Sequence, residues 1–152
     1  MVTLFAALAI QVVVASVVSA TEGAEPDAPA ALWTRLRRIE SAFRERDANS
    51  LRLSLSTSGK VRVEMKDLVA GQTAYGPGQL QVIFGQIFEV SQTRDLAFDK
   101  DDVRVATQGT AFARGRWVRR SVPGGQELVD TLTFTLREET GDWRIQEIRS
   151  SR

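Results

Sequence analysis

Gly141-Asp-Trp-Arg-Ile-Gln-Glu-Ile-Arg-Ser150 closes a stretch, from Asp102 to Arg152, in which apolar and polar residues alternate almost throughout. Alternation with a period of two is typical of β-strands that bury one face. Two turn signals divide the stretch, Val122-Pro-Gly-Gly125 and Glu139-Thr-Gly-Asp142. The sequence therefore predicts a long antiparallel meander in this part of the chain.

Two amphipathic helical segments precede the meander. The first is expected from about Ala30 to Arg46, with its charged face, which includes Arg35, in solvent. Its apolar face carries Leu32, Leu36, Ile39 and Phe43. The second, from about Gln79 to Val90, is so apolar that we expect the sheet to wrap around it. Helices followed by strands predict an α+β fold, in which the N-terminal helices pack in the concavity of a strongly curved, mainly antiparallel sheet.

Smaller features lie between and after these helices. Asp47 is expected to cap a short second helix, and Lys60–Met65 alternates like a strand. Thr93–Phe98 is predicted to be a strand that turns through Asp99-Lys-Asp-Asp102. Three acids in four residues also suggest calcium, but the glycine and distal glutamate of a calcium loop are missing. We therefore expect a solvated hairpin turn at this point.

The N-terminal segment predicts export. Residues 1–20 are uncharged and apolar and end in Val18-Ser-Ala20, which matches the small residues that signal peptidase recognises. We expect a cleaved signal peptide and a periplasmic or secreted protein; an uncleaved membrane anchor is the alternative. Residues 21–29 are expected to be a flexible lead-in, and residues 30–152 a single domain.

The composition narrows the classes of partner and chemistry. The chain has 20 basic and 19 acidic residues, a net charge of +1, which argues against nucleic acid or an anionic membrane surface as the main partner. It has neither cysteine nor histidine, and its acidic residues do not form a metal-binding motif. We therefore expect no cofactor and no metal.

Three ionisable side chains are expected at the mouth of a pocket. Alternation places Asp130 on the apolar face of its strand, and a period of two starting from Trp143 places Glu147 and Arg149 on the same inward face. Charges directed into an apolar interior are costly unless they meet each other, water or a ligand. The sequence leaves open whether they form an ion pair that closes the barrel end or contact a ligand. The candidate binding residues are Arg149, Glu147, Asp130, Tyr75 and Trp117.

The order of the elements resembles the nuclear-transport-factor-2-like superfamily, also described as cystatin-like cone or SnoaL-like proteins. Three motifs carry the likeness: Asp47-Ala-Asn-Ser-Leu51 at the second helix, the pair Phe84 and Phe88, and the terminal strand from Gly141 to Arg149. The resemblance covers about residues 30 to 150 and is nearest to small exported bacterial members of unknown function. It implies a cone-shaped fold and says almost nothing about activity.

The resemblance also indicates what catalysis would require. Enzymes of this superfamily, such as ketosteroid isomerases, limonene epoxide hydrolases and scytalone dehydratases, use Asp, Tyr or His side chains in the cone. Many relatives carry a His six residues after the Trp of the last strand, where this chain has Arg149. Histidine is the side chain poised near neutral pH, so its absence leaves only a perturbed carboxylate such as Asp130 or Glu147 for acid–base work.

Three functional hypotheses follow. The leading one is an exported, non-catalytic domain that binds a small apolar or amphipathic molecule or a protein partner. The second is a lyase, isomerase or hydrolase that uses Asp130 as base, Tyr75 as donor and Arg149 as anion stabiliser. The third is a structural module that forms a homodimer through the sheet, whose outer face carries several arginines beside a row of threonines. Those arginines are Arg104, Arg114, Arg116 and Arg144.

Overall fold

The computed structural model describes residues 27–71 and 73–152. The expected signal segment and most of the lead-in lie outside these residues. The helices are α1 (Ala30–Glu45), α2 (Ala48–Arg52) and α3 (Pro77–Val90). The strands are β1 (Val61–Glu64), β2 (Thr73–Tyr75), β3 (Ser91–Ala106), β4 (Thr110–Ser121), β5 (Glu127–Glu139) and β6 (Asp142–Ser151). Among the described helices, none is long and apolar enough to cross a membrane.

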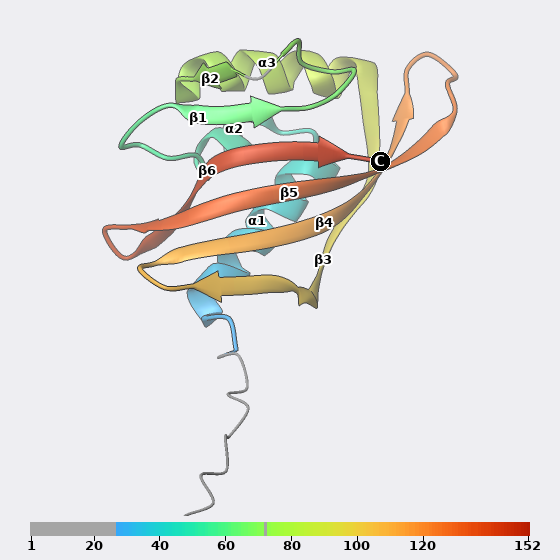
Figure 1. Ribbon diagram of the computed structural model, residues 1–152. Coiled ribbons are helices and arrows are strands. Elements are labelled where there is room, and N and C mark those ends of the chain that lie inside the picture. Colours follow the sequence, from blue (N-terminus) through green and yellow to red (C-terminus); the bar gives the residue numbers. More distant parts are fainter. Residues whose placement is uncertain (1–26, 72) are drawn as a thin grey trace, which may run out of the picture.

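The strands form one curved sheet in the order β2-β1-β6-β5-β4-β3. Its neighbours are antiparallel except β1 and β6, which run parallel. Figure 1 shows α1 behind the long strands and α3 along the β1–β2 end of the sheet. The prediction of an α+β fold with helices in the concavity of a mainly antiparallel sheet is therefore confirmed.

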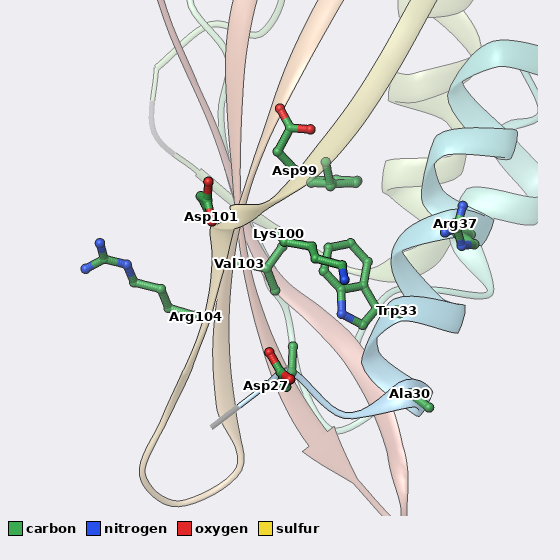
Figure 2. Close-up of a pocket in the computed structure, with 11 residues that line it drawn as sticks. Asp27, Ala30, Trp33, Arg37, Asp99, Lys100, Asp101, Val103 and Arg104 are labelled. Carbon is green, nitrogen blue, oxygen red and sulfur yellow. The ribbon is translucent and has the colours of Figure 1, made fainter. Parts of the chain in front are cut away.

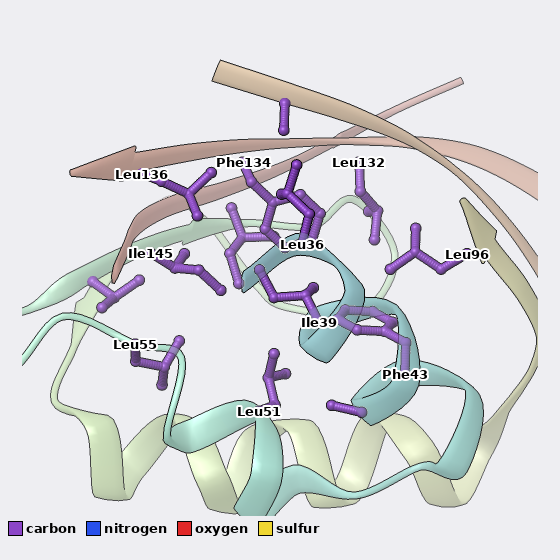
Figure 3. Packing of buried hydrophobic residues seen from close by; sticks show 14 of the residues in the cluster. Leu36, Ile39, Phe43, Leu51, Leu55, Leu96, Leu132, Phe134, Leu136 and Ile145 are labelled. Atoms are coloured by element: carbon purple, nitrogen blue, oxygen red, sulfur yellow. The ribbon is translucent and has the colours of Figure 1, made fainter. Parts of the chain in front are cut away.

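The concavity of the sheet is filled by apolar side chains. The apolar face predicted for the first helix is fully buried, and Figure 3 shows several of its residues against the side chains of β5 and β6. Phe43 makes edge-to-face contacts with Phe84, Phe88, Trp117 and Phe134, with ring centroids 5.4–6.2 Å apart. Such contacts stabilise a core beyond the area they bury. An aromatic cluster thus fills the interior of the curved sheet.

Two local predictions from the sequence were wrong. Arg35 is only 5% exposed, because Asp142 on β6 accepts two hydrogen bonds from its guanidinium group. Asp99–Asp102 is not a hairpin turn: both halves of β3 pair with β4, through Phe98 with Gly115 and Val103 with Ala113. The four residues between them bulge out of one continuous strand, since β4 supplies only one residue opposite them.

Candidate functional site

A second bulge decides where the predicted site residues of β6 lie. Leu136 pairs with Ile145, but the neighbouring Thr135 pairs with Glu147, so Gln146 is an extra residue in β6. One extra residue moves every later side chain to the opposite face of the sheet. Ile148 is therefore fully buried, and the inward orientation predicted for Glu147 and Arg149 is wrong.

Glu147 and Arg149 instead lie on the convex face, in pairs with β1. The Arg149 Nε atom donates a hydrogen bond to Glu64 Oε2 at 3.1 Å. Glu147 lies 3.7 Å from the guanidinium of Arg62 and accepts a hydrogen bond from the Thr135 hydroxyl. These pairs link the two parallel strands, and neither side chain faces the interior of the cone.

Asp130 does point inward, as predicted, and is only 4% exposed. Its two carboxylate oxygens accept hydrogen bonds from Arg119 Nε at 2.7 Å and from Arg152 Nε at 2.9 Å. Arg119, itself 3% exposed, also donates to the Ser91 hydroxyl. Because both oxygens of Asp130 are engaged by guanidinium groups, the carboxylate closes this end of the cone as an ion pair.

Alternation along β4 indicates that the side chain of Arg119 points inward. Ala113, Gly115 and Trp117 face inward in the structure, and the same alternation reaches Arg119. The sequence predicts an ion pair of Arg149 with Glu147 or Asp130, but Arg149 lies on the face of the sheet opposite to Asp130 and pairs with Glu64. Arg119 was missed because a charged side chain was not expected to continue an apolar face.

The two aromatic candidates have structural contacts. Trp117 is fully buried, donates its indole N–H to the Thr93 hydroxyl at 3.0 Å and carries the Arg119 guanidinium 5.0 Å from its ring centre. Tyr75, on the edge strand β2, is half-buried against the core. In the described part of the chain, no hydrogen bond joins Tyr75 to Asp130 or Arg149. The structure does not bring these three side chains together.

A groove of about 930 Å³ lies between the start of α1 and the bulge of β3. Its apolar floor consists of the half-buried Trp33 with Phe98 and Val103. Figure 2 shows Trp33 and Lys100 pointing into the same space from opposite walls. The backbone N–H of Phe98 donates to Glu40 on α1, a contact that fixes the distance between the two walls.

Charged side chains of both signs surround the groove floor. Its rim is formed by Asp27, Arg37, Asp99, Lys100, Asp101 and Arg104. The rim exists because the bulge exposes four consecutive polar residues beside the helix. Within residues 27–71 and 73–152, no three acidic side chains converge as a metal site, those of the bulge included. The groove thus combines an apolar floor with a charged rim, and its volume lies within the usual range for ligand sites.

Comparison with known proteins was made at the levels of sequence and structure. No family model and no curated protein matches the sequence. Solved structures do match. An NTF2-like protein of unknown function from Shewanella oneidensis superposes with a TM-score of 0.63 at 14% identity, over 80% of this chain and 97% of that one.

Two further neighbours have the same architecture. A DUF4783 family protein from Bacteroides ovatus has a TM-score of 0.60 at 13% identity, over 82% of this chain and 94% of its own. A ketosteroid isomerase-like protein from Erwinia carotovora atroseptica has a TM-score of 0.60 at 19% identity, over 80% and 90%. At such low identity the likeness concerns the fold. This chain has the nuclear-transport-factor-2-like cone fold, as its sequence resemblance implied.

Proposed function

We propose that this protein is a non-catalytic binding domain, and that its ligand is a small amphipathic molecule held in the groove between α1 and the bulge of β3. The observation that carries the proposal is the half-buried Trp33 on the floor of that groove, beneath the charged rim. Aromatic rings provide large contact areas for apolar parts of a ligand. The charged side chains of the rim would then hold the polar end of the ligand.

The packed interior supports a site outside the cone. Phe43, Phe84 and Trp117 are at most 1% exposed and contact one another through Phe43. A ligand inside the cone would have to displace these rings, which cores packed at crystal density resist. The groove needs no such rearrangement.

The catalytic alternative lacks support from the geometry. A carboxylate base, a donor and an anion stabiliser must converge on one substrate within hydrogen-bond reach. Asp130 faces inward in an ion pair with Arg119, whereas Arg149 lies on the convex face with Glu64. Two of the three proposed catalytic residues are therefore on opposite sides of the sheet.

Binding of 1-anilinonaphthalene-8-sulfonate, an amphipathic anion, tests the proposal. We expect saturable binding to the folded protein that is lost in Trp33→Ala and weakened in Lys100→Glu, which removes a cation from the exposed rim. Val82→Ala is the control, since that apolar side chain is 62% exposed on α3 and does not line the groove. Thermal melts establish that each variant is folded. Equal binding by the wild type, Trp33→Ala and Lys100→Glu would show that the groove is not the site.

Export is a separate proposal that rests on residues 1–20 alone. We propose that cleavage after Ala20 releases the domain into the periplasm or the medium. N-terminal sequencing of the protein recovered from those fractions should begin at Thr21. A product that retains Met1 and sediments with membranes would establish the anchored alternative.

A further inference from the structure

The convex face of the sheet carries a group of exposed side chains, of which only Arg104 also lies in the rim of the proposed groove. Alternation along β4 places Phe112, Arg114 and Arg116 on this face, and the adjacent β3 adds Arg104, which pairs in register with Phe112. On the other side, Arg114 pairs with Thr133 and Arg116 with Thr131. We call Arg104, Phe112, Arg114 and Arg116 the arginine face.

The three guanidinium groups of the arginine face have no carboxylate partner among the described residues. By contrast, Arg62 and Arg149 on the same side of the sheet form ion pairs with neighbouring strands. A hollow of about 400 Å³ lies beside the arginine face, lined by Asp102, Arg114, Arg116, Thr131 and the half-exposed Val129. The fold therefore exposes cations and hydroxyl donors without satisfying them.

Apolar surface accompanies these charges. Phe112 is 45% exposed and Val129 is 46% exposed, although most large apolar residues of the described chain are in the core. Arginine and exposed aromatic side chains are the residues most enriched at the energetic centres of protein interfaces. This combination distinguishes the arginine face from an ordinary solvated sheet surface.

We propose that the arginine face binds an acidic segment of a partner protein. Carboxylates of the segment would pair with Arg104, Arg114 and Arg116, whose planar guanidinium groups match the two oxygens of a carboxylate. The Thr131 hydroxyl would donate a further hydrogen bond, and an apolar side chain between the carboxylates would pack on Phe112.

The charges of the face argue against two other occupants. A second copy docked by the same face would bring a surface of unpaired arginines against itself, and like charges across an isologous contact are unfavourable. A nucleic acid would present continuous phosphates, but Asp102 lines the hollow beside these arginines and Glu147 lies two strands from Phe112 on the same side of the sheet. The chain also has a net charge of only +1. The carboxylates of a protein segment are spaced apart along its chain, so they can contact the arginines without lying next to Asp102 or Glu147.

Fluorescence anisotropy with a labelled peptide that alternates glutamate with leucine and serine tests this inference on the full domain. We expect peptide binding to weaken as the salt concentration rises. We also expect the affinity for the peptide to fall at least about tenfold in Arg114→Gln/Arg116→Gln, because charges across an interface attract the partner and hold it once bound. The matched control is Arg38→Gln/Arg46→Gln, which removes two exposed charges from the helical layer. Its binding should change by less than about threefold.

Three results would overturn the inference. These are absence of peptide binding, equal losses in both double variants, and tighter binding of duplex DNA or of phosphatidylglycerol vesicles than of the peptide. A sedimentation analysis that finds a dimer dissociated by Arg114→Gln/Arg116→Gln would assign the face to a second copy instead. Trp33→Ala should leave peptide binding unchanged. A failure of the groove proposal can therefore be distinguished from a failure of the proposal for the arginine face.

Discussion

Arg35 on α1 and Asp142 on β6 form a bidentate ion pair although 107 residues separate them, with Arg35 Nη2 at 2.7 and 2.6 Å from the two carboxylate oxygens. The same guanidinium donates to the Ser54 hydroxyl at 3.2 Å. Asp142 is also 3.0 Å from Arg144. The pair thus fastens the first helix to the start of the last strand, at the turn that closes the meander.

This pair should respond asymmetrically to mutation. Arg35 is 5% exposed and Asp142 is 40% exposed, so Asp142→Ala leaves a buried guanidinium without its counterion, whereas Arg35→Met leaves a carboxylate that water can reach. We expect Asp142→Ala to lower the free energy of unfolding by about 3 to 5 kcal/mol, and Arg35→Met by less. Urea denaturation measures both. A larger loss in Arg35→Met would mean that packing of the Arg35 stem outweighs the charge.

The buried pair Arg119–Asp130 should show strong coupling. Both side chains are at most 5% exposed, so removing either one leaves the other desolvated. We expect Arg119→Met and Asp130→Leu each to cost about 3 to 5 kcal/mol, and the double variant to be less destabilised than the sum of the two. Additive losses in a double-mutant cycle would contradict the pairing.

Glu139 should make stability depend on acid pH. Partial burial opposes its ionisation, but hydrogen bonds from the Ser56 and Ser58 hydroxyls, the Thr57 backbone N–H and Gln146 outweigh that effect and lower its pKa from 4.5 to about 2. A lowered folded-state pKa stabilises the fold above pH 4.5, and this contribution disappears as the pH falls toward 2. Glu139→Gln should therefore show a smaller decrease in melting temperature between pH 5 and pH 2 than the wild type does. The same slope in both proteins would argue against this role.

Aromatic truncations should separate core from surface. Phe84 and Trp143 are 1% and 4% exposed, so Phe84→Ala and Trp143→Ala should each cost about 3 to 5 kcal/mol through lost burial and a residual cavity. Phe112→Ala, at 45% exposed, is the control and should cost less than about 1 kcal/mol. Denaturant midpoints of the three variants provide the comparison. Equal losses would mean that the inward and outward faces are assigned incorrectly.

Local periodicity in the sequence determined much of the fold. The spacing of Leu32, Leu36 and Ile39 correctly predicted the buried face of α1, and alternation in β5 correctly predicted the inward side chains of Asp130 and Phe134. Asp47 caps α2 as expected, by accepting hydrogen bonds from the N–H groups of Asn49 and Ser50. These features depend on neighbours within one turn or one strand, which the sequence displays directly.

Only the tertiary structure decided which residues meet across the chain. Gln146 is an extra residue of β6 because β5 has no residue opposite it, and residues 99–102 of β3 lie opposite a single residue of β4. The pattern within β6 or β3 alone therefore reveals neither bulge. Each bulge changes where candidate site residues lie: the bulge at Gln146 places Arg149 on the convex face, and the bulge at residues 99–102 forms a wall of the groove. Bulges arise from the pairing of two strands, and pairing is a long-range property that the alternation of one strand does not contain.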